Sequence, residues 1–375
     1  MNKVHERPAT SDPLKILFFQ NGSLGDHLVT LPSIWTIREH FPHARFFLLS
    51  NVSVKGSKVA STDVFQGSGI FEKIFVYPEN NTWRDQLFRW LGFVMIFLKL
   101  KREHIDILVF LVPSKWTQER INRSLKFFHW LRIPQIIGDR GFPTFPIRSK
   151  TQSMPHCSKE ADLLLLRLKA SGLQIPDANA GNTSLNLKAQ EFLAFQTMQS
   201  QWRSDEGRRW VAIGPSANYF LKVWPEDRYD AVMAYLIRTY AIWPVTFGSK
   251  ADQALGERLI SKWKCGYNLA GKVSVRLAAV ALQRCWFYCG NDTGTMHLAA
   301  SVGIPCVAVF SSRDYPGLWY PYGSQHLVLR TSVPCEVCWL EECLEYQKKC
   351  ILSITVDQVI QACESVIHRT GIASK

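Results

Sequence analysis

Residues 14–50, LKILFFQNGSLGDHLVTLPSIWTIREHFPHARFFLLS, decide the fold class. The apolar run at 15–19 predicts a strand, the glycine-bearing stretch 21–25 predicts a turn, and the residues from about 26 to 40 predict a helix. A second strand is predicted at 45–50. A strand, a tight turn, a helix and another strand in this order are typical of parallel α/β layers.

The same alternation runs through the rest of the chain. In the first half, the further predicted strands are 73–76, 106–111 and 135–137, and a helix at 158–171 ends at Gly172. In the second half, the predicted strands are 209–213, 242–247, 286–289 and 306–310, with helices near 226–239, 250–262, 274–283 and 294–302. Two such series predict an α/β protein with two Rossmann-like domains that face a central cleft.

The domain limits follow from a polar stretch rich in Pro, Gly and Asn at 174–181. We expect an N-terminal domain at 14–175, a linker with the start of the second domain at 176–208, and a C-terminal domain at 209–353. A last helix, at 354–370, is expected to pack back toward the first domain.

The composition is that of an ordinary globular protein with an excess of positive charge. The chain has 375 residues, with 44 Lys and Arg against 31 Asp and Glu, a formal net charge of +13. This charge indicates either a solvated basic surface or an anionic partner: nucleic acid, a phosphorylated glycolipid or an acidic membrane. The basic residues are scattered and form no reader motif, so a nucleic-acid-binding protein is disfavoured.

The N-terminus and the cysteines predict the cellular compartment of the protein. Residues 1–13 lack the apolar segment of a signal peptide, and the ten cysteines of the chain are then expected to be mostly reduced. A cytoplasmic protein is therefore expected. The apolar run at 90–98, WLGFVMIFL, is followed by Lys99, Lys101 and Arg102 and is too short to span a bilayer. It predicts either a buried helix or an interfacial one.

The turn at 20–26, QNGSLGD, has two glycines three positions apart and then an aspartate. A dinucleotide-binding turn carries Gly-x-Gly-x-x-Gly, so the missing glycine argues against NAD or FAD and against a dehydrogenase. Asp26 has two interpretations. It caps the start of a helix, or, on a loop beyond a strand, it takes a proton from an attacking hydroxyl.

The second half carries two loops with polar residues. Gly214-Pro215-Ser216 follows a predicted strand, and Lys222 lies shortly before Pro225, a residue suited to the first turn of a helix. Lys222 is either a solvated side chain or a phosphate ligand, and the next motif favours the second interpretation.

That motif is residues 290–297, GNDTGTMH, between a predicted strand and a predicted helix. Backbone N–H groups at such a helix start form an anion site, and the small residues Thr293 and Gly294 let phosphate oxygens approach. Asp292 would repel an anion but can bind hydroxyls. A phosphorylated sugar offers both groups, so the pair of features points to a nucleotide sugar. His297 is predicted to be structural.

Three segments resemble glycosyltransferase family 9, the ADP-heptose lipopolysaccharide heptosyltransferases. Residues 268–312, NLAGKVSVRLAAVALQRCWFYCGNDTGTMHLAASVGIPCVAVFSS, resemble the family's C-terminal signature. Residues 214–232, GPSANYFLKVWPEDRYDAV, resemble its Lys-x-Trp-Pro segment, and residues 14–50 resemble its Gly-Asp-containing opening. The resemblance covers roughly 14–369. It departs from the family at Ser311-Ser312, which replace a Gly-containing turn, and it is weak in the first domain beyond residue 60.

The resemblance implies a GT-B fold, an N-terminal acceptor domain, a C-terminal donor domain and an inverting, metal-independent transfer that uses no cofactor. Asp26 matches the general base, and Asp292 matches the contact to sugar hydroxyls. The remaining donor-binding residues that it implies are Lys222 and the backbone of Thr293 and Gly294 at the diphosphate, Asp252 near the ribose, and Ser216. The sequence itself also fits metal independence, because it has no pair of aspartates separated by one residue that could hold a divalent ion against a diphosphate. Lys222 and a helix dipole would neutralise the leaving group instead.

The partners implied are a nucleotide-sugar donor, ADP-heptose, and an anionic acceptor like the lipopolysaccharide core at the inner-membrane surface, with no nucleic acid. A family relative that glycosylates a protein or another glycan is the main alternative. Four cysteines near the C-terminus, Cys335, Cys338, Cys343 and Cys350, are either packing residues or ligands of a structural Zn or Fe ion. Some relatives that glycosylate proteins bind iron through cysteines. We predict packing cysteines and no essential metal.

Overall fold

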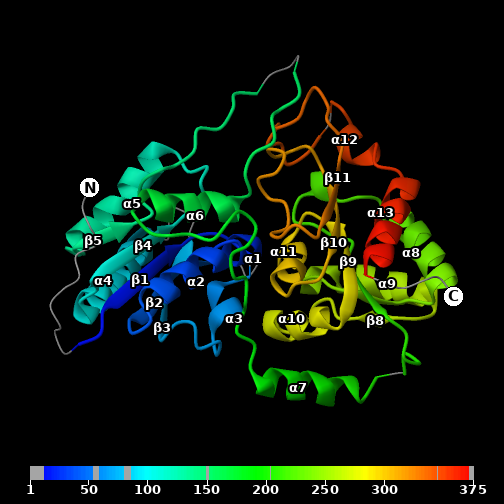
Figure 1. Ribbon diagram of the computed structural model, residues 1–375, viewed down its shortest axis with the longest axis horizontal. Helices are drawn as coiled ribbons and strands as arrows, with labels where there is room; N and C mark the ends of the chain where they lie inside the picture. The colour runs from blue at the N-terminus through cyan, green and yellow to red at the C-terminus, as the bar shows by residue number, and fades with distance from the viewer. Residues whose placement is uncertain are drawn as a thin grey trace. The chain divides into compact units, whose positions relative to one another are not determined.

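The computed structural model describes residues 12–53, 59–79, 86–148, 152–202, 204–343 and 345–370. It divides into two compact units (Figure 1). The first unit contains Met1–Phe145 and Glu160–Asn186, and the second contains Pro146–Lys159 and Leu187–Lys375. Most of the polar N-terminal stretch, residues 1–13, lies outside the described residues.

The first unit is built on a five-stranded parallel sheet of order β3-β2-β1-β4-β5. Its strands are β1 (Lys15–Gln20), β2 (Arg45–Ser53), β3 (Lys73–Glu79), β4 (Ile107–Leu111) and β5 (Gln135–Ile137). The order reverses between β1 and β4, and in open α/β sheets ligands bind at such a switch point, beyond the carboxyl ends of the strands. The turn after β1 therefore lies where a site is expected.

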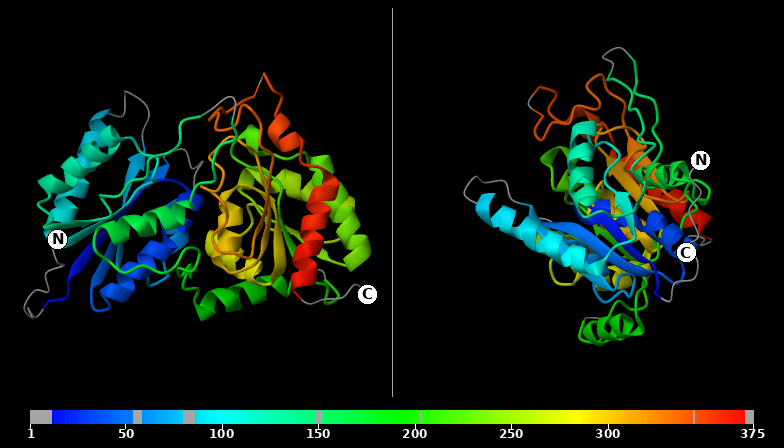
Figure 2. Two further views of the ribbon diagram at one scale, coloured as in Figure 1. Left: turned by 45° about the horizontal axis from the view of Figure 1, so that its top comes forward. Right: turned by 90° about the vertical axis from the view of Figure 1, so that its left-hand side faces the viewer.

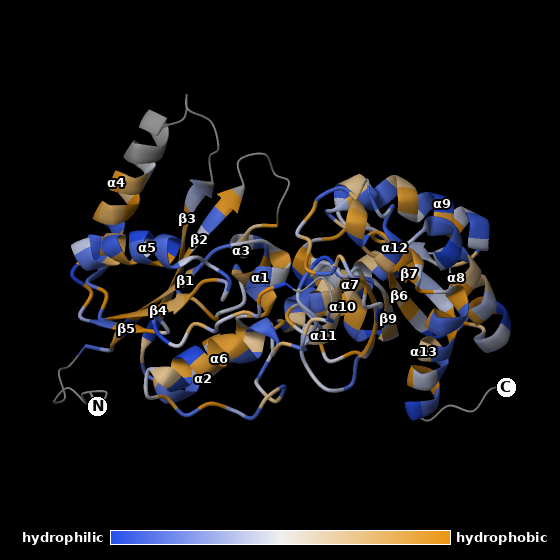
Figure 3. Cartoon of the chain, turned by 90° about the horizontal axis from the view of Figure 1, so that it is seen from above, coloured by the Kyte–Doolittle hydropathy of each residue, from blue (hydrophilic) through white to orange (hydrophobic). Residues whose placement is uncertain are grey.

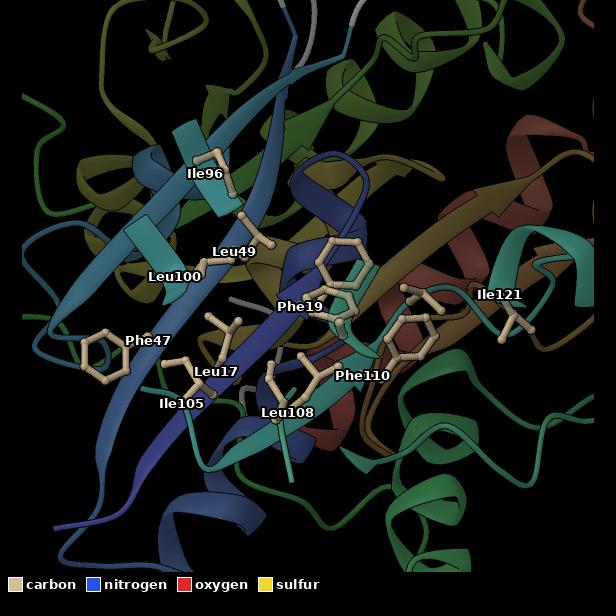
Figure 4. Close-up of a cluster of buried hydrophobic side chains, with 13 residues drawn as sticks. Leu17, Phe19, Phe47, Leu49, Ile96, Leu100, Ile105, Leu108, Phe110 and Ile121 are labelled. Carbon is tan, nitrogen blue, oxygen red and sulfur yellow. The ribbon is translucent and has the colours of Figure 1, made fainter. Parts of the chain in front are cut away.

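Helices cover both faces of this sheet, with α4 and α5 on one face and α2 and α6 on the other (Figure 3). The helices of the unit are α1 (Leu24–Leu28), α2 (Leu31–His40), α3 (Ser61–Phe65), α4 (Gln86–Glu103), α5 (Gln118–Trp130) and α6 (Glu160–Ala170). Alternate strand residues such as Leu17, Phe19 and Leu49 pack with Ile96 of α4 and Ile121 of α5 in a buried cluster (Figure 4). This face of the sheet is the one that matters for the pocket described below.

The helix predicted from about 26 to 40 is two helices in the structure. The helix α1 ends at Leu28, and α2 begins at Leu31, with Thr30 as its N-cap and a proline in its first turn. Pro32 has no backbone N–H to donate to the preceding turn, so it favours a new helix start rather than continuation. The continuous helix was therefore wrong, and the short α1 carries Asp26.

The second unit has a six-stranded parallel sheet of order β11-β10-β9-β6-β7-β8. Its strands are β6 (Trp210–Gly214), β7 (Trp243–Thr246), β8 (Tyr267–Asn268), β9 (Cys285–Asn291), β10 (Cys306–Phe310) and β11 (Leu327–Arg330). Renumbered from its own first strand, this is the 3-2-1-4-5-6 order of a doubly wound nucleotide-binding sheet. The switch point lies between β6 and β9, where Gly214 pairs with Gly290. The sequence had predicted neither β8 nor β11, which are the two edge strands.

The helices of the second unit lie on both faces of its sheet, with α10 and α11 on one side and α8, α9 and α13 on the other (Figure 1). They are α7 (Ala189–Gln199), α8 (Glu226–Tyr240), α9 (Gln253–Trp263), α10 (Val275–Gln283), α11 (Gly294–Ser301), α12 (Lys349–Leu352) and α13 (Val356–Arg369), with two 3-10 turns, η2 (Phe220–Lys222) and η3 (Lys250–Asp252). The prediction of two Rossmann-like domains is confirmed.

The domain limits differ from those predicted. The segment 146–159 belongs to the second unit, because the Met154 N–H donates to Glu336 at 2.6 Å and the Cys157 N–H donates to the Pro316 carbonyl at 2.7 Å. The Lys159 ammonium donates to the carbonyls of Pro321 and Gly323. Residues 176–186, predicted as linker, stay with the first unit.

The last helix, α13, lies close to its predicted bounds of 354–370. It packs within the second unit, against α8 and the strand β10, as two further views show (Figure 2). Its buried face includes Val359, Cys363 and Val366. Glu364 accepts hydrogen bonds from two hydroxyls of α8, at 2.7 Å from Tyr235 and 3.0 Å from Tyr240. The buried face of α13 is thus used inside the second unit, and the expected packing of this helix toward the first domain stays a prediction.

Candidate active site

The predicted site residues fall into two groups, one in each unit. Asp26 lies after β1 in the first unit, whereas Ser216, Lys222, Asp252, Asp292, Thr293 and Gly294 all belong to the second. Asp26, Ser216 and Asp292 each follow the carboxyl end of a strand at a switch point, the place where a ligand is expected. Each group is described within its own unit.

Asp26 is held by its own turn. Its Oδ2 accepts a hydrogen bond from the Ser23 N–H at 2.8 Å and another from the Ser23 hydroxyl at 3.1 Å. Asp26 is the third residue of α1, so this is a capping box that satisfies a backbone donor at the helix start. The capping interpretation of Asp26 therefore describes a real contact. A carboxylate has several acceptor positions, so capping through Oδ2 does not by itself exclude proton transfer.

Gly22 makes this arrangement possible. Its φ is +146°, and a Cβ built at this position would collide with the Asp26 side chain. The Gly22 N–H donates to the Asn51 side chain at 2.8 Å, which ties the turn to the end of β2. The first glycine of the QNGSLGD motif is thus required by the folded position of the carboxylate.

Lys222 and Asp292 form an ion pair in the second unit. The Lys222 Nζ lies 2.5 Å from Asp292 Oδ2, and the two side chains are 14% and 7% exposed. The pair joins η2 to the end of β9, just before α11. An ion-paired carboxylate repels an anion less than an unpaired one, so the pair removes the objection that Asp292 raised against the predicted phosphate contacts.

The start of α11 has no side-chain cap from its own N-cap residue. Its N-cap, Thr293, has an extended backbone, and the Thr293 side chain makes no capping hydrogen bond. The first N–H groups of the helix from Gly294 are therefore not satisfied by that side chain, and they carry the positive end of the helix dipole. Thr293 and Gly294 stand where the sequence predicted diphosphate contacts.

Asn291 organises the loops around this helix start and was not predicted. Its side chain is fully buried. Its Oδ1 accepts from the Trp224 N–H at 3.1 Å and the Tyr229 hydroxyl at 2.9 Å, while its Nδ2 donates to the Pro215 carbonyl at 2.9 Å and the Ser216 carbonyl at 3.4 Å. One amide thus fixes the loop carrying Ser216 and the segment after Lys222. A polar residue ending a buried strand inside GNDTG is the signal that could have found it.

Tyr288 shapes the same switch point. A Cβ at Gly214 or at Gly290 would collide with the Tyr288 hydroxyl, so the two glycines leave room for it between β6 and β9. The hydroxyl donates to the Asn291 carbonyl at 3.3 Å. The glycines of the two predicted motifs therefore serve the packing of one tyrosine.

Asp252 and His297 have structural contacts. Asp252 Oδ2 accepts from the Ser249 N–H and hydroxyl, both at 2.7 Å, as the capping carboxylate of η3. Its contact to a ribose stays a prediction. Burial lowers the pKa of His297 to about 4, so its imidazole is neutral at pH 7. A neutral buried ring agrees with the structural role predicted for it.

The first unit holds a buried carboxyl that the sequence did not single out. Glu160, at the start of α6, accepts from the Ser114 N–H at 2.6 Å, and its other oxygen has no hydrogen-bond partner among the described residues. Burial raises the pKa of Glu160 to about 7, although the Ser114 hydrogen bonds and the Arg167 charge lower it. The negative charge of Asp26 adds to the rise. Nothing in the local pattern SKEAD marks it.

The four C-terminal cysteines lie near one another. Burial raises the pKa of the Cys335 thiol, and the neighbouring thiols of Cys350, Cys338 and Cys343 raise it further. Within the described parts of the chain, no group of three or more His, Cys, Asp or Glu side chains is arranged to hold a metal ion. The absence of an essential metal here stays a prediction.

The helix α4 contains the apolar run 90–98. Ile96 and Leu100 are buried, whereas Phe93, Met95 and Leu98 are 41%, 58% and 48% exposed. In the part of the chain that is described, no helix is both long and apolar enough to cross a bilayer. The helix is buried along one side and exposes apolar side chains along another, so both interpretations of this run stay predictions.

Comparison with known proteins gives a consistent result. Residues 168–349 match the model of glycosyltransferase family 9 (heptosyltransferase). The lipopolysaccharide heptosyltransferase 2 of Salmonella typhimurium is 24% identical over 182 residues, which are 47% of this chain and 51% of that protein. The aligned part thus spans about half of that relative.

Two solved structures cover almost the whole chain. The glycosyl transferase family 9 protein of Veillonella parvula has a TM-score of 0.71 at 19% identity, over 96% of this chain and 98% of that one. E. coli ADP-heptose lps heptosyltransferase II has a TM-score of 0.67 at 15% identity, over 96% and 100%. These likenesses confirm the GT-B fold class. Motifs, family model and relatives agree, and the matched part of the chain, residues 168–349, belongs to glycosyltransferase family 9.

Proposed function

We propose that the protein transfers a heptose from ADP-heptose to the core of lipopolysaccharide, with inversion and without a metal ion. The observation that carries this proposal is the Lys222–Asp292 ion pair just before α11, a helix start without a side-chain cap. It combines a cation for a diphosphate with a carboxylate for sugar hydroxyls. The relatives support the same substrates, since one is a lipopolysaccharide heptosyltransferase and another an ADP-heptose lps heptosyltransferase.

The donor enters by an exchange of partners. The diphosphate approaches the N–H groups of Thr293 and Gly294, and the Lys222 ammonium turns from Asp292 to a phosphate oxygen. Asp292 then accepts hydrogen bonds from hydroxyls of the sugar. The charge that develops on the leaving diphosphate is stabilised by Lys222 and the helix start, groups already in position before reaction. Ser216 lines the same switch point, and Asp252 contacts the ribose.

The acceptor step needs a base. A hydroxyl oxygen of the acceptor attacks the anomeric carbon of the heptose from the face opposite the diphosphate. The new carbon–oxygen bond forms as the bond to the diphosphate oxygen breaks, and the configuration inverts. Asp26 takes the hydroxyl proton, and ADP leaves with the electron pair of the broken bond. The excess of basic residues favours an anionic acceptor, and we place the reaction at the cytoplasmic surface of the inner membrane.

The test is a transfer assay with purified protein, ADP-heptose and lipopolysaccharide that lacks its core heptoses. We expect release of ADP and a gain of one heptose in the mass of the acceptor, with equal rates in EDTA and in Mg²⁺. Loss of activity in EDTA that Mg²⁺ or Mn²⁺ restores would contradict the metal-free scheme. Transfer to a protein substrate with none to lipopolysaccharide would replace the acceptor assigned here.

A further inference from the structure

The first unit contains a pocket whose lining residues have no role in the transfer step proposed above. Its volume is about 590 Å³, and it opens between α4 and α5 at the end of the buried cluster shown in Figure 4. Phe19 and Leu49 of the sheet line it from below, and Phe93, Ile96, Phe127 and Phe128 of the two helices line it from the sides. These six side chains carry no polar atom.

The rings that line the pocket are packed edge to face. Phe19 lies 5.0 Å from Phe128, and Phe93 lies 6.2 Å from Phe127, between ring centroids. A sugar ring placed among them would leave its hydroxyls without partners, which costs free energy when they lose water. An alkyl chain has no such cost, and its burial is favourable. The interior therefore suits a hydrocarbon group.

The helix α5 supplies three of the six polar side chains that line the pocket, and the other three are Asn21, Tyr77 and Trp116. Arg120, Arg123 and Ser124 line it. Arg120 stacks at 3.8 Å on the Trp116 ring and makes a long hydrogen bond of 3.4 Å to Asn21. Arg123 forms no ion pair or hydrogen bond with any described residue. Two guanidinium groups beside an apolar pocket, one of them unpaired, complement a phosphate.

The outer side of α4 continues this pattern. Phe93, Met95 and Leu98 are exposed, and Lys99, Lys101 and Arg102 follow at the end of the helix. Figure 3 shows the hydrophobic colouring of this part of α4 next to the polar α5. Exposed apolar side chains beside basic ones are typical of helices that lie in the surface of an anionic bilayer.

We propose that this pocket binds one anionic membrane lipid, with an acyl chain between α4 and α5 and its phosphate against Arg120 and Arg123. The exposed side of α4 then rests in the bilayer surface. The lipid is a phosphate-bearing amphiphile of the membrane, separate from donor and acceptor. Its binding does not depend on the transfer reaction proposed above.

The first measurement is a titration of the whole protein with dodecyl phosphate, below its micelle concentration, followed by tryptophan fluorescence because Trp116 lines the pocket. Arg123→Ala should raise the Kd about tenfold, the effect of losing a charge-assisted contact. Ser124→Phe, which fills the pocket, should raise it by at least as much. Lys126→Ala removes the same charge from an exposed position of α5 and should change the Kd less than twofold. Inorganic phosphate and decyl maltoside should bind far more weakly than dodecyl phosphate.

The second measurement is flotation with phosphatidylglycerol vesicles, which Arg123→Ala and Ser124→Phe should weaken and Lys126→Ala should not. Equal losses in Arg123→Ala and Lys126→Ala would mean attraction by net charge alone and would overturn the pocket. Unchanged flotation with a raised KM for an acylated acceptor would assign the pocket to the acceptor instead. Binding of dodecyl phosphate by a protein that transfers no sugar would contradict the proposed function and leave this inference standing.

Discussion

The turn after β1, residues 20–26, and the turn after β9, residues 290–294, both lead from a buried parallel strand into a helix, and both carry an aspartate. Asp26 is held by Ser23, three residues away. Asp292 is held by Lys222, seventy residues away. The carboxylate of the first turn is thus held by a near neighbour in sequence, although the turn itself is also tied to Asn51 of β2. The carboxylate of the second turn is held by a distant loop that has folded against it.

The polar residues that end the strands before the two turns, Gln20 and Asn291, differ in the same way: their contacts lie at different distances along the chain. Gln20 contacts His27 and Thr30, at most ten residues away. Asn291 contacts segments 62 to 76 residues away. The difference suggests a division of labour in which the first turn presents a carboxylate of fixed geometry and the second assembles a site that changes partners when the donor binds. The following changes test that division.

Asp26→Asn should have the largest effect on turnover. The amide oxygen can still accept from Ser23, so the turn keeps its shape, but it cannot take a proton. We expect kcat to fall by ~10²–10⁴, with donor affinity and Tm near those of the unchanged protein. Single-turnover kinetics and donor titration measure both. A near-normal kcat in Asp26→Asn would return Asp26 to a capping role, and Ser23→Ala is the control for the cap itself.

Lys222→Ala should lower kcat/KM by ~10²–10³, since a cation at the developing diphosphate charge is lost. Unlike Asp26→Asn, it should also weaken donor binding, because the buried Asp292 is left charged and repels the diphosphate. The double variant Lys222→Ala with Asp292→Asn removes that repulsion and should recover part of the donor affinity but not kcat. Isothermal titration with ADP measures this. No recovery would mean that the ion pair and the donor site are independent.

Asn291→Ala should destabilise the second unit more than Gln20→Ala destabilises the first. It leaves the Trp224 N–H, the Tyr229 hydroxyl and the Pro215 carbonyl without their partner, at about 1–3 kcal/mol for each buried group. We expect a loss of roughly 3 kcal/mol or more, measured by urea unfolding followed by fluorescence. Equal losses in the two variants would remove the contrast between local and long-range construction.

These three cases also show what the sequence could predict. The strands and helices near both turns follow from short-range hydrophobic patterns, and the exposed edge strands β8 and β11 were missed because they are short or only partly buried. Asp26, Lys222 and Asp292 were found because each stands in a recognisable motif. The pairing of Lys222 with Asp292, the role of Asn291 and the burial of Glu160 depend on contacts between distant segments, which a local pattern does not encode.

Glu160 should make stability depend on pH in the first unit. Its pKa in the folded protein is about 7, raised by burial from 4.5. The folded state therefore keeps a proton that the unfolded state loses, so this contribution is fully present below pH 4.5 and is lost as pH rises through 7. The size is roughly 3 kcal/mol. We expect the difference between the unfolding free energies at pH 5 and pH 8 to be smaller in Glu160→Gln than in the unchanged protein. An equal difference in the two proteins would show that Glu160 is not the group responsible.

Asp252→Ala should have the smallest effect, and it decides whether this residue resembles Asp26 or Asp292. Like Asp26, it caps a turn through a serine three residues earlier, so Asp252→Ala and Ser249→Ala should each cost about 1 kcal/mol of stability. A ribose contact adds a second consequence for Asp252 alone: the KM for the donor should rise several-fold in Asp252→Ala and stay unchanged in Ser249→Ala. Ser249→Ala loses the hydroxyl bond to Asp252 and keeps the backbone N–H bond, whereas Asp252→Ala loses both. The KM difference is therefore compared with the measured loss of stability in each variant. Equal KM values in the two variants would reduce Asp252 to a cap and remove it from the donor site.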